Sequence, residues 1–96
     1  MATENKKIGI VIADDHTMLR EAMRSAFAQY PDLEVLAEAS DGREAVAKSV
    51  ELKPDIVIMD IVMPELSGIE ATKEIRRVSP TTAVLILTAY DDDRYV

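Results

Sequence analysis

Short apolar runs alternate along this chain with longer segments in which apolar residues recur every three or four positions. The runs are rich in β-branched and aliphatic residues, which is typical of strands. We therefore expect four strands, at 8–13, 33–39, 56–59 and 83–87. The segments between them have the helical period. We expect three helices there, at 17–30, 42–53 and 66–78.

Strands and helices alternate with connections that are too short for anything but β–α–β units. Such units require a parallel sheet with helices on both faces, so we expect one α/β domain with a doubly wound sheet. The first, third and fourth runs are almost continuously apolar, which predicts strands buried on both faces. The second run alternates with acidic residues and is expected nearer an edge of the sheet. The helix residues predicted to face inward are Met18, Leu19, Ala22, Met23, Ala26, Phe27, Ala45, Val46, Val50, Ile69, Ala71 and Ile75.

Charge and composition exclude several classes of protein. Eighteen acidic and eleven basic residues give a net charge of −7, which has the wrong sign for gripping nucleic acid or an anionic membrane. Cysteine is absent, which excludes a disulfide framework and a cysteine-based zinc site. No apolar run is long enough for a transmembrane helix or a secretory signal. We expect a cytoplasmic protein.

Polar residues follow the predicted strands at their carboxyl ends, where doubly wound sheets carry their functional sites. Asp14 and Asp15 follow the first strand, Asp60 the third, and Thr88 and Ala89 the fourth. If the first and third strands are neighbours, three carboxylates converge in a small volume. They repel one another unless a cation neutralises them. Carboxylate oxygens without cysteine suit a hard ion, so we expect a Mg²⁺ site.

Less specific interpretations also account for single residues. Each Asp could cap the helix that follows it, because Asp is a favoured N-cap residue. Three charges at facing strand ends are not needed for capping, so we favour the cation site. We interpret His16 as a histidine of a solvated loop or first helical turn, not as a metal ligand. Thr88, taken alone, is typical of turn chemistry.

Asp60 suggests a reaction. A carboxylate beside a bound magnesium ion can attack a phosphoryl group and become an acyl phosphate. Such a transfer asks little of the protein beyond positioning and charge neutralisation. Three Asp residues and one Thr could supply most of that.

Four segments match a known family in order, at 10–16, 55–64, 68–70 and 85–90. With them the chain resembles the receiver domain of bacterial two-component response regulators, from about Lys7 to its end. The sequence Ala13-Asp14-Asp15-His16, followed by Leu19-Arg20, is most similar to the NarL/FixJ (LuxR-type) transcriptional regulators. The resemblance implies a flavodoxin-like fold with strand order 2-1-3-4 and a fifth strand beyond the fourth.

The resemblance also implies roles for individual residues. Asp60 would be the phospho-acceptor, and Asp15 and Asp14 would hold Mg²⁺, together with Asp60 and the backbone carbonyl of Val62. Thr88 would be the hydroxyl that moves to the phosphoryl group, and Ala89 would leave space for it. The implied partners are a sensor histidine kinase and the regulator's own DNA-binding output domain. A chain of this kind is a phospho-accepting switch and not a turnover enzyme.

One part of the family pattern is missing. The family's fifth strand ends in a lysine that contacts the phosphoryl group, and no lysine of residues 1–96 takes that place. We therefore interpret the chain as a single, incomplete receiver domain without the helix-turn-helix output domain, and expect slow or no phosphorylation. An interaction or oligomerisation module without phosphorylation is the alternative, and a flavin-binding module is a third. We expect a homodimer or a swapped oligomer, because the outer edge of the fourth strand would invite pairing.

Overall fold

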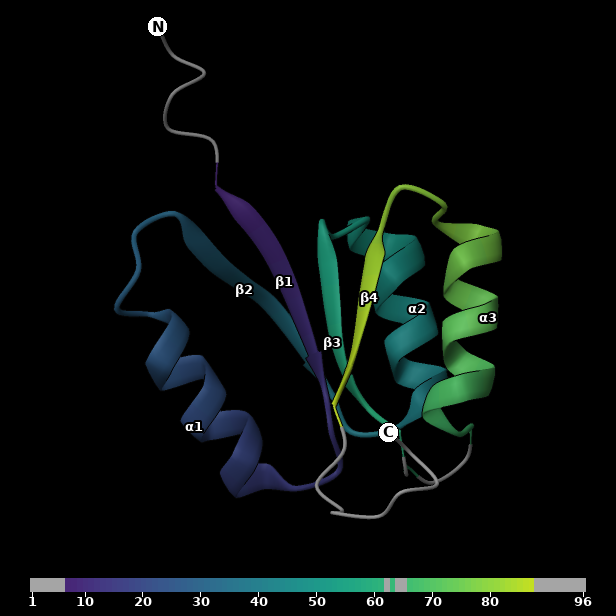
Figure 1. The fold of residues 1–96 in the computed structure, drawn as a ribbon, viewed down its shortest axis with the longest axis horizontal. Helices are drawn as coiled ribbons and strands as arrows, with labels where there is room; N and C mark the ends of the chain where they lie inside the picture. Colours follow the sequence, from purple (N-terminus) through teal and green to yellow (C-terminus); the bar gives the residue numbers. More distant parts are fainter. Residues whose placement is uncertain (1–6, 62, 64–65, 88–96) are drawn as a thin grey trace, which may run out of the picture.

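The computed structural model describes residues 7–61, 63 and 66–87. Four parallel strands form one sheet in the order β2-β1-β3-β4 (Figure 1), which confirms the predicted flavodoxin-like arrangement. The strands are β1 (Ile8–Ala13), β2 (Leu33–Ala39), β3 (Ile56–Asp60) and β4 (Ala83–Leu87). The helices are α1 (Thr17–Phe27), α2 (Gly42–Leu52) and α3 (Gly68–Val78). In this part of the chain, no helix is both long and apolar enough to cross a lipid bilayer.

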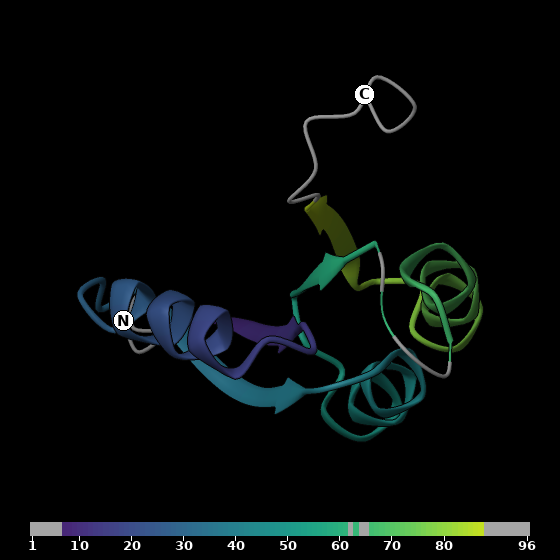
Figure 2. The same cartoon turned by 90° about the horizontal axis from the view of Figure 1, so that it is seen from below.

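The helices cover the two faces of the sheet unequally (Figure 2). α1 lies on one face, where Met23 and Phe27 pack against Ile10, Ile12 and Ile58. α2 and α3 lie together on the other face, over a larger buried cluster. Its members come from three strands, two helices and the loop after β3: Val11, Ala13, Ala39, Ala45, Val57, Met59, Met63, Ala71 and Ile75. Successive residues of β1 and β3 thus serve opposite layers, as expected for buried parallel strands.

Asp55 ties three strands together at their amino ends. Its carboxylate accepts a hydrogen bond from the Gly9 amide at 2.7 Å, and its own amide donates to the Gly9 carbonyl at 2.9 Å. The Ala83 amide donates to the Asp55 carbonyl at 3.0 Å. These contacts start β1, β3 and β4 at a common level, so their carboxyl ends meet at the opposite edge of the sheet.

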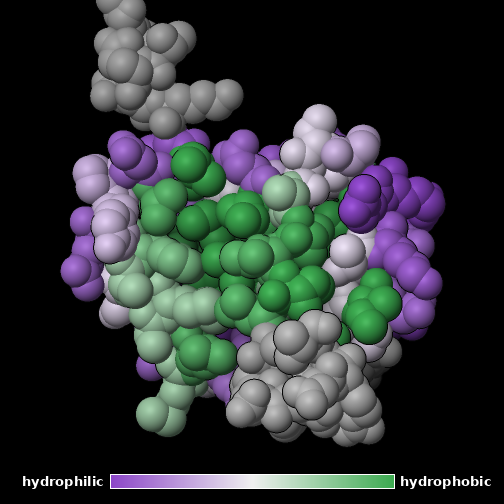
Figure 3. All heavy atoms as spheres, viewed as in Figure 1, coloured by the Kyte–Doolittle hydropathy of each residue, from purple (hydrophilic) through white to green (hydrophobic). Residues whose placement is uncertain are grey.

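The predicted burial of β4 is wrong. Its residues are mostly exposed, with Leu85 48% and Leu87 37% accessible. β4 lies at an edge of the sheet that the described residues form, and α1 lies over β1 and β2 instead of covering it. Figure 3 shows the result, a broad apolar surface over the middle of the sheet. The apolar side chains of β4 would be buried if another surface packed against them. No element in the described part of the chain does so.

Several helix residues predicted to face inward are also exposed. On α3 the buried residues are Gly68, Ala71 and Ile75, which share one stripe, whereas Ile69 is turned away and 51% exposed. On α2, Val50 is 49% exposed, and the buried position beside it is Ser49, whose hydroxyl donates to the Ala45 carbonyl. α1 has no fully buried residue. In each case the predicted apolar stripe is wider than the part of the helix that packs against the sheet.

The two isoleucines of α3 provide a matched test of this packing. Ile75→Ala should lower the free energy of unfolding by about 2–5 kcal/mol, because it removes a fully buried side chain and leaves a cavity. Ile69→Ala should change it by about 0.5 kcal/mol or less. Both changes alter helix propensity in the same way, so the difference reports burial. Urea denaturation followed by circular dichroism measures it, and equal effects of the two substitutions would contradict this packing.

Candidate functional site

Asp14 and Asp60 lie side by side because β1 and β3 are parallel neighbours. Ala13 is paired with Met59 in the sheet, so the next residue of each strand is an aspartate at the same level. Asp14 and Asp60 are buried, at 2% and 7% exposure, whereas the Asp15 side chain is 37% exposed. One ligand atom from each of Asp14, Asp15, His16 and Asp60 lies within 4.8 Å of the others. The predicted convergence of three carboxylates is confirmed.

The capping alternative does not explain these aspartates. The N-cap residue of α1 is His16, and no side chain accepts a capping hydrogen bond there. α3 is capped by Ser67, whose hydroxyl accepts from the Glu70 amide. An aspartate does cap α2: Asp41 accepts from the Glu44 amide at 2.8 Å. Asp14, Asp15 and Asp60 are therefore not explained as helix caps.

α3 holds the backbone of Asp60 by close contact. The Gly68 amide donates to the Ile61 carbonyl at 3.0 Å. A Cβ atom at position 68 would lie 2.4 Å from the Asp60 carbonyl oxygen and 2.8 Å from the Ile61 Cα. Only glycine lets the start of α3 approach β3 this closely, which gives a physical reason for the glycine at this position.

His16 belongs to the cluster more closely than the sequence suggested. Its side chain is 64% exposed and it stands just before the first turn of α1, as predicted. Its Nδ1, however, lies 2.8 Å from Asp14 Oδ1 and 3.1 Å from Asp15 Oδ1. The hydrogen bond to Asp14 and the charge of Asp15 raise the pKa of the His16 imidazole above its ordinary value of 6.5. Protonated His16 is thus a partial counter-charge for the aspartates.

The donor set fits a hard divalent cation. Three carboxylates offer oxygen ligands in a small volume, and partial exposure of Asp15 leaves room for the waters that Mg²⁺ keeps. Asp14, Asp15 and Asp60 would hold the ion. The remaining predicted site residues, Val62, Thr88 and Ala89, lie outside the described residues, so their roles stay predictions.

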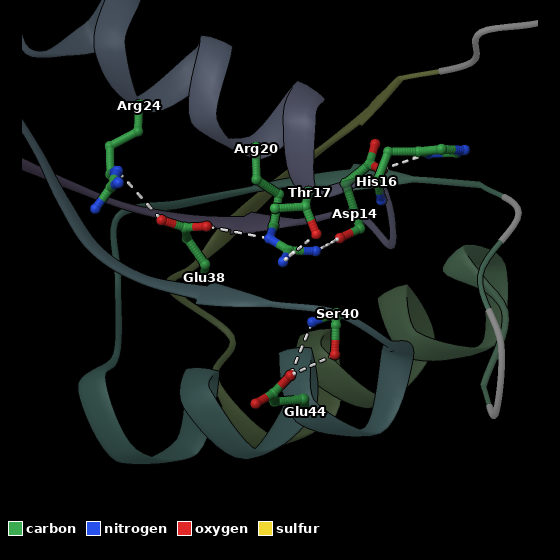
Figure 4. Close-up of polar contacts among 8 residues, drawn as sticks. All are labelled: Asp14, His16, Thr17, Arg20, Arg24, Glu38, Ser40 and Glu44. Carbon is green, nitrogen blue, oxygen red and sulfur yellow. Dashed lines mark hydrogen bonds and ion pairs between the residues drawn. The ribbon is translucent and has the colours of Figure 1, made fainter.

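Sequence reasoning missed two polar residues beside the cluster. Arg20 of α1 donates to the Asp14 backbone carbonyl and to Glu38 at the end of β2 (Figure 4). The sequence identifies Arg20 only as part of a family motif, and Glu38 only as an acidic residue in an alternating strand. Their meeting depends on how α1 crosses β2, which local patterns do not encode.

Comparison with known proteins agrees with this geometry. Residues 10–96 match the family model of the response regulator receiver domain. The chain belongs to the response regulator receiver family. It is 46% identical over 87 residues to the transcriptional regulatory protein YhcZ of Bacillus subtilis, and 44% identical over 86 residues to LiaR of the same species. These alignments cover 91% and 90% of this chain but 41% of each relative, so the chain spans about two fifths of their length.

Solved receiver structures show the same fold. The signal receiver domain of the putative response regulator NarL from Mycobacterium tuberculosis superposes with a TM-score of 0.88 at 30% identity. That match covers 95% of this chain and 73% of the other. A LuxR-family response regulator from Aurantimonas superposes with a TM-score of 0.85 at 37% identity, covering 94% of this chain and 64% of the other. The resemblance to NarL- and LuxR-type receivers is confirmed, and the family gives no support to the flavin-binding alternative.

The sequence has a single histidine, so the pKa of His16 can be measured without overlap and reports the charges of the neighbouring aspartates. In the metal-free protein we expect His16 to titrate above 6.5, and Asp14→Asn to lower its pKa most, because Asp14 contributes both a hydrogen bond and charge. Asp60→Asn should lower it least, since Asp60 is the weakest contributor. Because the folded state raises this pKa, the stabilisation is full below pH 6.5 and is lost as the pH rises through the raised value. NMR titration of the imidazole protons measures all three values, and a His16 pKa at or below 6.5 would contradict the contacts.

Proposed function

We propose that this receiver accepts a phosphoryl group on Asp60 from a sensor histidine kinase, with Mg²⁺ bound by Asp14, Asp15 and Asp60. The observation that carries the proposal is the convergence of these carboxylates at one edge of the sheet in a chain of the receiver family. Its relatives are transcriptional regulatory proteins. We infer that the phosphorylated state is passed to a DNA-binding output domain outside these residues.

The residues present suit that chemistry. An oxygen of the Asp60 carboxylate forms a bond to phosphorus, while the bond from phosphorus to the donor atom breaks and the donor keeps the electron pair. Bound magnesium supplies positive charge that balances the phosphoryl oxygens. Asp14 and Asp15 hold that charge beside Asp60, and burial of Asp60 limits access of water to the acyl phosphate.

The test is magnesium-dependent phosphorylation by acetyl phosphate, followed by intact mass. We expect a slow gain of one phosphoryl group that needs Mg²⁺ and is lost in Asp60→Asn. The rate is expected to be slow because the lysine implied by the family is absent from residues 1–96, and losing one such contact costs about 2.7–4 kcal/mol. Asp15→Ala should abolish Mg²⁺ binding measured by calorimetry.

Asp32→Asn is the matched control, because Asp32 is exposed and its carbonyl accepts from the Ile8 amide at the amino end of β1, opposite the cluster. It should react as the parent does. Magnesium affinity that survives Asp15→Ala, or a phosphoryl group on another residue, would overturn the assignment. A rapid and complete reaction would show that the lysine is dispensable.

A second candidate function, an oligomerisation module, is favoured by the open edge of β4. No described strand lies on the far side of β4, and its exposed residues are apolar. Such an edge can pair with another strand. We propose that this chain self-associates through β4 into a symmetric dimer, either edge to edge or by exchange of the segment that follows.

Leu85→Lys should weaken this association, because a lysine on the open face must lose water when another chain covers it. Ile69→Lys is the control, since Ile69 is about as exposed but lies on α3. Sedimentation velocity across a range of concentrations measures the dimer. A parent chain that stays monomeric throughout would rule out self-association, and equal weakening by both lysines would place the contact elsewhere.

A further inference from the structure

We propose that Arg20 is a positioning residue of the acidic site, which fixes the backbone of Asp14 so that the Asp14 and Asp15 carboxylates face Asp60. The inference rests on the proposed function in one respect, namely that the cluster holds a divalent cation. Arg20 itself bears a positive charge and is no ligand for that cation.

The guanidinium of Arg20 binds three different elements (Figure 4). Nη1 donates to the Asp14 backbone carbonyl at 2.5 Å, and Nε donates to Glu38 Oε1 at 3.1 Å. Nη2 makes a longer contact with Thr17 Oγ1 at 3.4 Å. The Arg20 side chain is 15% exposed, so its contacts with Asp14 and Glu38 are partly sheltered from water, whereas the contact with Thr17 is exposed. The end of β1, the start of α1 and the end of β2 are thereby joined through one planar group.

Glu38 sets the direction of that group. It lies on β2 beside Ile12 of β1, and its carboxylate is 27% exposed. Its second oxygen lies 3.3 Å from Nε of Arg24, one helical turn after Arg20. Arg24 is 59% exposed and Arg20 only 15%, so the contact of Glu38 with Arg20 is the better sheltered of the two. Arg20 therefore has a partly sheltered partner on one side and can hold the Asp14 carbonyl on the other.

Both backbone polar groups of Asp14 are then occupied by fixed partners. Its amide donates to the Ala39 carbonyl of β2 at 3.0 Å, and its carbonyl accepts from Arg20. The carbonyl of Asp14 belongs to the peptide that leads into Asp15, so its orientation sets where both carboxylates begin. The Asp14 side chain in turn accepts from the His16 amide at 2.7 Å. Without Arg20, the Asp14 carbonyl loses this partner, and among these contacts the amide bond to Ala39 is the one that still holds the Asp14 backbone.

A role of Arg20 through its charge and a role through positioning predict opposite effects of its removal on Mg²⁺ affinity, which makes the inference testable. Removing a positive charge near the carboxylates should strengthen cation binding, because less repulsion opposes the ion. Removing an anchor of the ligand-bearing backbone should weaken it, typically by about 10–100-fold for groups that orient metal ligands. If Arg20 acts by position, its loss lowers Mg²⁺ affinity in spite of the favourable change in charge.

The experiment compares Arg20→Met with Arg24→Met in a magnesium titration by calorimetry. Both variants lose one arginine that contacts Glu38, but only the first loses the contact with the Asp14 carbonyl. We expect at least about ten-fold weaker binding in Arg20→Met and unchanged or slightly tighter binding in Arg24→Met. Arg20→Lys keeps the charge without the planar fork, and should also bind weakly. It serves as the test variant if Arg20→Met does not fold.

Hydrogen exchange of the metal-free proteins gives a second readout. The His16 amide, bonded to the Asp14 carboxylate, should exchange faster in Arg20→Met or Arg20→Lys than in Arg24→Met. If the parent binds no Mg²⁺ and this difference is still present, the proposed function fails and the positioning role stands. If the parent binds Mg²⁺ and the Arg20 variants bind it equally or more tightly, the positioning role is overturned. Equal exchange in all variants overturns it as well.

Discussion

Like-charge repulsion among three aspartates is the constraint that the rest of this structure must satisfy. One ligand atom from each of Asp14, Asp15 and Asp60 lies within 4.8 Å of the others, although two of the residues are buried. Flexible carboxylates would move apart. They remain together because β1 and β3 are directly paired and because Asp55 aligns the opposite ends of these strands. The ladder of the sheet and the His16 imidazole, which contacts Asp14 and Asp15, therefore oppose this repulsion, and a bound cation would relieve it further.

Much of the fold could be predicted because hydrophobic period and strand order are local or family properties. The four strands, the three helices and the edge position of β2 were all expected from the sequence. Burial was less predictable. Leu85 and Ile69 are as apolar as buried residues, but their exposure depends on which surfaces meet the sheet. An apolar side chain can be buried, but whether it is buried depends on how the neighbouring elements are arranged.

The residues of the site also differ in how far the sequence predicts them. The convergence of Asp14 and Asp60 was predictable, because parallel neighbours bring their carboxyl ends to one edge. The contacts of Arg20 and Glu38 were not, since they join residues eighteen positions apart through a helix crossing that no short motif specifies. His16 is intermediate. Its place before α1 was expected, whereas its approach to two carboxylates depends on the turn that Asp14 makes with its own side chain.

Two physically different constraints hold the two buried aspartates. Asp60 is fixed by contact, since the backbone of α3 at Gly68 leaves no room for a side chain beside the Asp60 carbonyl. Asp14 is fixed by polar groups, through Ala39 on one side and Arg20 on the other. Steric exclusion is insensitive to salt, whereas the Arg20–Glu38 pair, at 15% and 27% exposure, is partly screened by it. Added salt should therefore act on the contacts that hold the Asp14 backbone more than on the close approach of Gly68 to the Asp60 carbonyl.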